Sequence, residues 1–182
     1  MKVLIYGADG AGSLVGGFLA RTGHAVSLLG EAAHLNVIKK DGLTITGIWG
    51  DYRIKAFDLY TEVSQIKNPD FDLIILSAES YASEKAVDEI FPLIQEKTVL
   101  FSLGEGAGNF DILLKKISSD RLLAGEAVLG LETSPGRVQV KSITKIAIQT
   151  PLGAAPKLSP ERMAVILQNS KIPAKVVPAV SS

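Results

Sequence analysis

One short segment near the start of the chain limits its fold more than any other. The apolar run 3–6 has the composition of a buried strand, and it leads directly into the glycine-rich turn 7–12, with the sequence GADGAG. After the turn, apolar side chains recur at helical spacing from 14 to 19, and Gly23 follows the helix as a C-terminal cap residue does. This order of strand, turn and helix is typical of the first unit of a parallel α/β sheet.

The next segments repeat the alternation of strand and helix. Residues 25–29 predict a second apolar strand and 32–40 a second helix, which ends at Asp41 and Gly42. Such an alternation requires parallel strands joined by crossover helices. Further along, the patterns predict strands at 43–46, 52–57, 73–76, 98–102, 122–131, 137–141 and 145–149, and helices at 82–91, 109–116 and about 160–170.

The predicted fold class is α/β: a Rossmann-like, doubly wound parallel sheet with an antiparallel extension from about 120 to 150. Strands 43–46 and 52–57 surround a turn at 49–51, which predicts a hairpin or a pair of edge strands. The turn at 134–136, with the sequence SPG, predicts a second hairpin. We expect the 182 residues, 1–182, to form a single domain.

Composition narrows the class of protein. Apolar residues make up 47% and charged residues 21%, as in ordinary globular domains. Lys plus Arg and Asp plus Glu both total 19, so the zero net charge favours neither nucleic acid nor an anionic membrane as partner. The absence of cysteine excludes disulfides and thiolate nucleophiles or metal ligands. The opening apolar run is too short for a signal peptide, and no stretch is long enough for a transmembrane helix, so we expect a soluble, cytoplasmic protein.

The glycine-rich turn carries the first functional hypothesis. Backbone amides at a helix start offer donors and a positive dipole end to a pyrophosphate, so the turn predicts a dinucleotide site. Gly7 permits the tight turn, and Gly12 lets helix and strand pack closely. The middle glycine of the GxGxxG pattern is replaced by Asp9, although Gly10 can serve if the loop is reshaped. A carboxylate about 4 Å from a pyrophosphate costs about 4 kcal/mol at an effective dielectric of about 20, unless Asp9 turns outward or shares a metal ion.

Several segments resemble ketopantoate reductases (2-dehydropantoate 2-reductases), in the order in which that family has them. GADGAGSL at 7–14 resembles the family's GAGAIGSL, and RTGHAVSL at 21–28 resembles RAGHDVTL. DLIIL at 72–76 precedes the position of the VKAYQT segment, in which Tyr81 keeps the tyrosine. LGEG at 103–106 stands where the family has LQNG, and PGRV at 135–138 resembles PGxV. The resemblance covers nearly the whole chain.

The resemblance implies a domain that binds NAD or NADP and takes part in hydride transfer from the nicotinamide to a 2-oxo acid. In the family, the catalytic lysine and the main substrate contacts come from a C-terminal helical domain that has no match before Ser182. We therefore expect an incomplete catalyst and assign a catalytic role to no residue. Lys171 and Lys175 are not assigned the role of the family's catalytic lysine. His24 and His34 have no partners spaced for a metal, so we expect no metal site and interpret both as structural.

Four departures from the family pattern introduce carboxylates where the family faces an anionic cofactor or substrate. Asp9 replaces the middle glycine, and Glu31 stands where an arginine binds the 2′-phosphate. Glu79 replaces the lysine of VKAYQT, and Glu105 replaces the asparagine of LQNG. The cofactor-binding candidates are Gly7, Ala8, Asp9, Gly10, Ala11, Gly12, Ser13, Glu31, Ser77, Glu79 and Glu105.

Three interpretations of these acids remain open. In the first, Glu31 binds the ribose hydroxyls of the adenosine, which favours NAD over NADP. In the second, the cleft has lost dinucleotide binding and belongs to a non-catalytic relative, a ligand-sensing or interaction module without NAD or NADP. In the third, the alignment is shifted in the loops and some of the acids are irrelevant. A homodimer in which the second copy completes the site is a further hypothesis.

Overall fold

The computed structural model describes residues 1–77, 84–104 and 110–179, and these form two sheets. The strands of the main sheet are, in spatial order, β12 (Ala174–Val176), β11 (Ile146–Gln149), β8 (Leu122–Glu126), β7 (Val99–Gly104), β6 (Leu73–Ser77), β1 (Lys2–Tyr6), β2 (Ala25–Leu29) and β5 (Phe57–Tyr60). The smaller sheet has the order β4 (Tyr52–Ile54), β3 (Leu43–Gly47), β10 (Arg137–Ile143) and β9 (Leu129–Ser134). The described helices are α1 (Gly10–Arg21), α2 (Ala32–Asp41), α4 (Glu84–Ile90), α5 (Phe110–Leu114) and α6 (Pro160–Asn169), with short 3₁₀ helices η1 (Val63–Gln65), η2 (Phe91–Leu93) and η3 (Ser119–Arg121).

The strand order shows that the winding of the main sheet reverses next to β1. From β5 to β8 all neighbouring strands are parallel, whereas β11 is antiparallel to β8. The chain runs outward from β1 through β2 to β5, then returns to the other side of β1 and continues through β6, β7 and β8. The winding therefore reverses between β1 and β6, which is where doubly wound sheets bind ligands at the carboxyl ends of their strands. This topology confirms the predicted Rossmann-like fold class.

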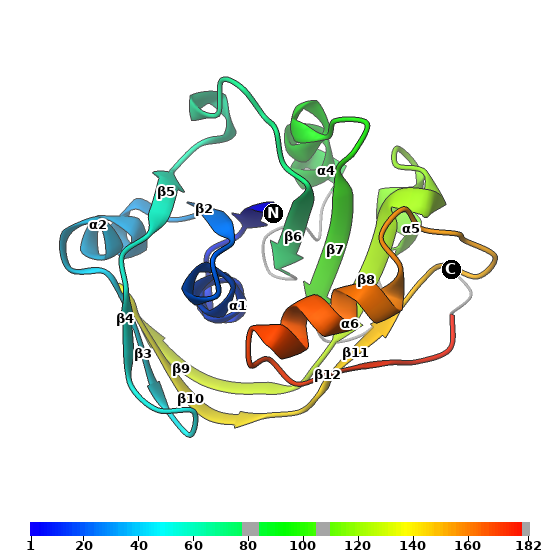
Figure 1. Cartoon of the computed structure of the whole chain (residues 1–182). Helices are drawn as coiled ribbons and strands as arrows, with labels where there is room; N and C mark the ends of the chain where they lie inside the picture. Colours follow the sequence, from blue (N-terminus) through cyan, green and yellow to red (C-terminus); the bar gives the residue numbers. More distant parts are fainter. Residues whose placement is uncertain (78–83, 105–109, 180–182) are drawn as a thin grey trace.

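Helix α1 lies between the two sheets. Figure 1 shows it end-on, with β1 and β2 on one side and the curved strands β9 and β10 on the other. Its residues from Gly12 to Leu19 are all buried, because α1 contacts β1, β2 and β6 as well as β3, β9 and β10. Toward the smaller sheet, the ring of Phe18 meets those of Trp49 and Tyr52 edge to face, with centroids 5.2 and 5.4 Å apart. The smaller sheet thus holds α1 against the parallel core.

Glycine allows α1 to lie very close to β1. A Cβ atom at Gly12 would lie 2.2 Å from the carbonyl oxygen of Gly7 and 2.8 Å from Cγ2 of Ile5, which is closer than van der Waals contact permits. Gly7 makes the turn with a φ of +91°, a conformation that side chains rarely adopt. The structure therefore gives Gly7 and Gly12 the turn and packing roles that the sequence predicts.

Two predicted strands are wrong in extent because the chain changes sheets within them. The single strand expected at 122–131 is divided, since β8 ends at Glu126 in the main sheet and β9 begins at Leu129 in the smaller one. The strand expected at 52–57 is likewise divided into β4 and β5, and β5 pairs with β2 in parallel. The extension therefore also includes β3 and β4 and contains the parallel pair β3 and β10.

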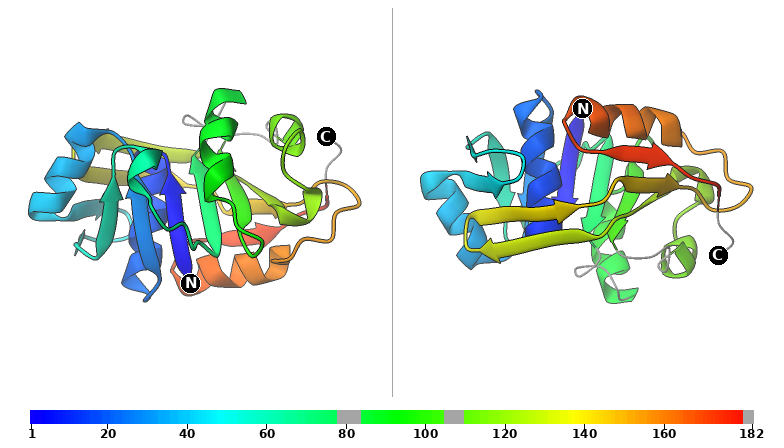
Figure 2. Two further views of the ribbon diagram at one scale, coloured as in Figure 1. Left: turned by 90° about the horizontal axis from the view of Figure 1, so that it is seen from above. Right: turned by 90° about the horizontal axis from the view of Figure 1, so that it is seen from below.

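Helices cover both faces of the main sheet, as the views in Figures 1 and 2 show. Helices α4 and α5 lie on one face, and α1 and α6 on the other. The buried apolar side chains form two corresponding clusters, one that includes Val87 and Leu113 and one that includes Phe18 and Met163. Among the described residues, no helix is long and apolar enough to cross a membrane.

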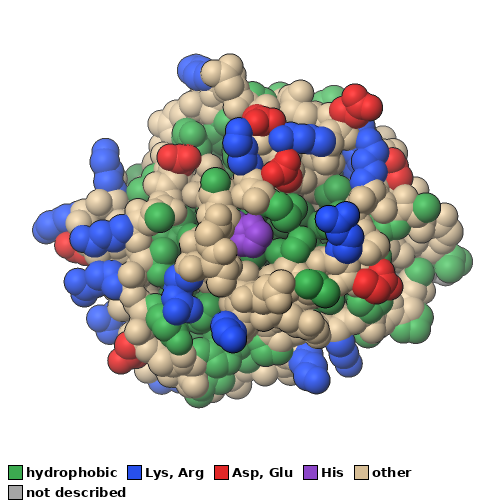
Figure 3. Space-filling model, viewed as in Figure 1, with side chains coloured by type: hydrophobic (Ala, Val, Ile, Leu, Met, Phe, Trp, Pro, Cys, Tyr) green, Lys and Arg blue, Asp and Glu red, His purple; other side chains and the backbone are tan. Residues whose placement is uncertain are grey.

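Charged side chains of both signs are interspersed over the surface seen in Figure 3. One network joins residues before or at the start of β1, β6 and β7. Lys2 Nζ lies 2.6 Å from Asp70 Oδ2, and Lys97 Nζ lies 2.7 Å from Asp70 Oδ1 and 2.9 Å from Asp72 Oδ1. Hydrogen bonds from Lys2 and Lys97 lower the pKa of Asp70 to about 2. Because exposed ion pairs contribute little to stability, the fold rests on its buried apolar clusters.

Replacing Gly12 by alanine is expected to destabilise the fold by about 3 kcal/mol, because α1 would have to move away from β1. Urea denaturation followed by circular dichroism measures this change in the free energy of unfolding. Gly23→Ala is the matched control, since Gly23 has a φ of +93° but a Cβ there would meet nothing within 4 Å. Only backbone strain of about 1 kcal/mol is expected in the control. Equal losses in the two variants would contradict the packing explanation.

Candidate functional site

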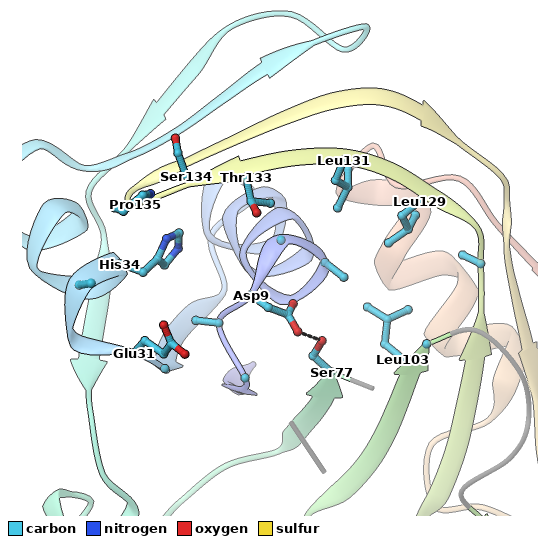
Figure 4. Close-up of a pocket in the computed structure, with 18 residues that line it drawn as sticks. Asp9, Glu31, His34, Ser77, Leu103, Leu129, Leu131, Thr133, Ser134 and Pro135 are labelled. Atoms are coloured by element: carbon cyan, nitrogen blue, oxygen red, sulfur yellow. Dashed lines mark hydrogen bonds between the residues drawn. The ribbon is translucent and has the colours of Figure 1, made fainter. Parts of the chain in front are cut away.

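A cavity of about 920 Å³ lies over the carboxyl ends of the parallel strands, at the reversal between β1 and β6. Figure 4 shows its lining, which comes from the glycine-rich turn, the start of α2, the ends of β6 and β7, and one side of β9. The lining residues are Gly7, Ala8, Asp9, Gly10, Ala11, Gly30, Glu31, Ala33, His34, Ser77, Leu103, Gly104, Ala127, Leu129, Leu131, Thr133, Ser134 and Pro135.

The glycine-rich turn brings the start of α1 to this cavity. The amides of Gly7 and Ala8 both donate to the carbonyl of Leu29, at 3.0 and 2.8 Å, which ties the turn to the end of β2. Helix α1 then begins at Gly10, and both Gly10 and Ala11 line the cavity. The first amides of a helix have no acceptor one turn back, and they carry the positive end of the helix dipole. The N–H groups of Gly10 and Ala11 are therefore suited to an anion.

Asp9 does not turn outward but is held at the start of α1. It is the N-cap residue of the helix, and its Oδ1 accepts a hydrogen bond from the amide of Gly12 at 2.8 Å. Its Oδ2 accepts a hydrogen bond from the hydroxyl of Ser77, which ends β6. The carboxylate therefore joins the β1–α1 turn to β6 and uses the third amide of the helix.

Glu31 has a different environment on the other side of the turn. It follows β2 and is the N-cap residue of α2, but its side chain makes no capping hydrogen bond. The residue is exposed, and it lines the cavity. In Figure 4, Glu31, Asp9, Ser77 and Leu103 follow one another across the site. The Glu31 carboxylate is thus available to accept hydrogen bonds from a ligand at the β2 end.

His34 connects three parts of the site. Its Nδ1 accepts a hydrogen bond from the amide of Gly136 at 3.0 Å, and its Nε2 lies 2.9 Å from Oγ of Ser13. Because Nδ1 accepts, the neutral ring carries its proton on Nε2 and donates it to Ser13. Burial lowers the pKa of His34 below its usual value of 6.5, against smaller opposing effects of the Ser134 carbonyl, Asp9 and Glu31. His34 therefore has the structural role that the sequence predicts, because it joins α2 to α1 and to the β9–β10 turn.

Strand β9 forms a wall of the cavity that the sequence analysis missed. Leu129, Leu131 and Thr133 alternate along the strand and line the cavity. Thr133 lies over the turn so closely that a Cβ at Gly10 would be 2.5 Å from its Cγ2. The alternation of residues 129, 131 and 133 before the SPG turn is the sequence signal that could have identified this wall.

The predicted site residues divide into three groups. Residues 7–11, Glu31 and Ser77 line the cavity. Gly12 and Ser13 are buried behind the turn, where Gly12 packs on β1 and Ser13 binds His34. Glu79 and Glu105 lie outside the described residues.

A second cavity, of about 590 Å³, shares Gly7, Gly30 and Glu31 with the first and extends toward η1 and α4. Tyr6 lines it, and its hydroxyl donates to Oε2 of Glu89 at 3.1 Å. Burial, together with the hydrogen bond to Glu89, raises the pKa of Tyr6 to about 12. Tyr6 is therefore a protonated donor at neutral pH. Within the described part of the chain, no group of three or more His, Cys, Asp or Glu residues could hold a metal ion.

Known proteins resemble this chain in sequence and in fold. Residues 3–153 match the family described as ketopantoate reductase PanE/ApbA. The 2-dehydropantoate 2-reductase of Pyrococcus abyssi is 33% identical over 145 residues, covering 80% of this chain and 44% of that protein. The corresponding protein of Aquifex aeolicus is 29% identical over 157 residues, covering 84% of this chain and 48% of that protein.

Among solved structures, the ternary structure of D-mandelate dehydrogenase with NADH and anilino(oxo)acetate matches with a TM-score of 0.81 and 29% identity. The match covers 97% of this chain and 57% of that one. The chain thus spans about half the length of the curated relatives it matches, at 48% and 44%.

Replacing His34 by alanine is expected to destabilise the protein by about 2 kcal/mol at pH 8, because buried groups of Ser13 and Gly136 lose their partner. Folding lowers the pKa of His34, so its neutral ring stabilises the fold above pH 6.5. That contribution is lost as the pH falls through the lower folded-state value. Urea denaturation at pH 8 and pH 5 should therefore show a smaller difference from wild type at pH 5. Asn36→Ala, at an exposed position of α2, is the control and should have little effect at either pH.

Proposed function

We propose that this chain, which belongs to the ketopantoate reductase PanE/ApbA family, forms the cofactor-binding part of an oxidoreductase that uses a nicotinamide dinucleotide. The observation that carries the proposal is that Gly10 and Ala11, the first two residues of α1, line the cavity. They lie at the reversal point of a doubly wound sheet, where a pyrophosphate would meet both donors and the helix dipole. The cavity of about 920 Å³ is large enough for an extended ligand.

The two halves of a dinucleotide would lie on opposite sides of these amides. In our proposal the adenosine extends toward Glu31 at the end of β2, and the nicotinamide extends toward Ser77 and Leu103 at the ends of β6 and β7. Glu31 would accept hydrogen bonds from the ribose hydroxyls. A 2′-phosphate would instead place a further negative charge beside this carboxylate, so NADH is the proposed cofactor rather than NADPH.

When bound, the dinucleotide would supply hydride for a carbonyl carbon, and we propose a 2-oxo acid as the acceptor. The residues of this chain would bind and orient the cofactor. Leu103, Leu129 and Leu131 would exclude water from the nicotinamide half of the cavity. Glu31 lies at the adenosine end, Asp9 is an acceptor in two hydrogen bonds, and His34 is engaged at both ring nitrogens. We therefore assign no catalytic proton donor to these lining residues.

A non-catalytic relative is the alternative function, and the position of Asp9 favours it. The carboxylate already binds one amide of the helix start and places a negative charge near the proposed pyrophosphate site. A ligand with a neutral or cationic group would avoid that repulsion. The alternative would make the cleft a sensing or interaction site without a nicotinamide cofactor.

Calorimetric titration of the chain with NADH and with NADPH tests the proposal. We expect NADH to bind with a micromolar dissociation constant and NADPH at least about tenfold more weakly, a free-energy difference of about 1.4 kcal/mol. Equal affinities would overturn the role of Glu31. Absence of binding by either cofactor would overturn the dinucleotide proposal and favour the alternative.

Glu31→Arg is expected to reverse the preference, because a guanidinium would attract the 2′-phosphate that the carboxylate repels. The matched control is Glu132→Arg, which makes the same change of charge on β9 at an exposed residue that pairs with Lys141. The control should leave the ratio of the two dissociation constants unchanged. A reversal in both variants would mean that overall charge, rather than Glu31, sets the preference.

A further inference from the structure

Asp9 and Glu31, the two acidic residues among the described lining of the cavity, place their negative charges on different sides of the glycine-rich turn. Glu31 stands at the β2 end, whereas the Asp9 carboxylate is fixed by the Gly12 amide and the Ser77 hydroxyl. Figure 4 shows Asp9 turned toward Ser77, with Leu103 beyond it. The charge of Asp9 therefore lies on the β6 side of the turn, in a position set by two hydrogen bonds.

The partly apolar lining around Asp9 strengthens the interaction of its carboxylate with other charges. Leu103 from β7, with Leu129 and Leu131 from β9, forms apolar walls on this side of the cavity. Asp9 itself is half-buried, and Ser77 is 2% exposed. Where apolar walls exclude water, the effective dielectric falls and a charge interacts more strongly than on an exposed surface.

On the proposed function, on which this inference rests, the nicotinamide occupies the same half of the cavity. The oxidised nicotinamide ring carries a positive charge and the reduced ring carries none, whereas the two forms share the same pyrophosphate. A carboxylate on this side repels the pyrophosphate of both forms alike but attracts only the oxidised ring. We propose that Asp9 is a specificity-determining residue that makes the site favour the oxidised over the reduced dinucleotide.

Asp9→Asn tests this role with little change in geometry. Asparagine is a good N-cap, so its side-chain oxygen can still accept from Gly12, and its amide can donate to the Ser77 oxygen. We expect the ratio of the NADH to the NAD⁺ dissociation constant to fall about tenfold in the variant, because NADH binding improves and NAD⁺ binding improves less. Calorimetric titration of the full chain with each form measures both constants. Asp9→Ser, a second uncharged N-cap, should lower the ratio in the same direction.

The control is Glu132→Gln, which removes one negative charge from an exposed residue of β9. Its ratio should equal that of the wild type, because residue 132 alternates with the cavity-lining Leu131 and Thr133 and so lies on the other face of β9, where solvent and salt screen its charge. Equal changes in both dissociation constants of Asp9→Asn and Asp9→Ser would overturn the inference while leaving dinucleotide binding intact. Absence of binding by both forms in wild type and variants would overturn the proposed function together with the inference.

Discussion

The close approach of α1 to β1 is the constraint on which the rest of the structure depends. Glycine at position 12 lets the helix lie against the turn and Ile5, and this leaves room for a second sheet to pass on its other side. Strand β9 can then lie directly over Gly10. The first residues of α1 consequently line a walled cavity, where a partial loss of water would strengthen the interaction of their amides with a charged ligand.

The acidic residues of the site illustrate how neighbours decide what a carboxylate does. From the sequence, Asp9 is expected to oppose a pyrophosphate unless it turns away or shares a metal ion. In the structure, Asp9 accepts hydrogen bonds from the Gly12 amide and the Ser77 hydroxyl, and it stabilises the start of α1 as an N-cap. Glu31 occupies the N-cap position of α2 without such a bond, so its acceptors remain available to a ligand. Two residues of the same charge and the same helix position therefore have different uses.

Sequence reasoning predicted the parts of the molecule that depend on local pattern. The turn after β1, the buried strands and the start of α6 at Pro160 follow from periodicity and from the conformations of glycine and proline, although α1 begins at Gly10, earlier than the predicted turn 7–12 allows. The division of 122–131 between two sheets could not be predicted, because its apolar pattern continues while its hydrogen-bond partners change from β7 and β11 to β10. For the same reason, the sequence identified the glycine-rich floor of the site but missed the wall formed by Leu129, Leu131 and Thr133. The bridging role of His34 depends on Gly136, far away in the sequence, and no local pattern indicates it.

The enclosure of α1 also determines when the site can form during synthesis and folding. The glycine-rich turn and its helix are made before the strands β9 and β10, which cover them and follow more than 100 residues later. The bond between His34 and Gly136 joins residues 102 positions apart, and that between Thr22 and Ser170 joins residues 148 apart. Contacts so distant in sequence slow folding, because long loops must close before any of them stabilises the chain. The surroundings of the glycine-rich turn are therefore completed only after residues more than 100 positions further along the chain have been made.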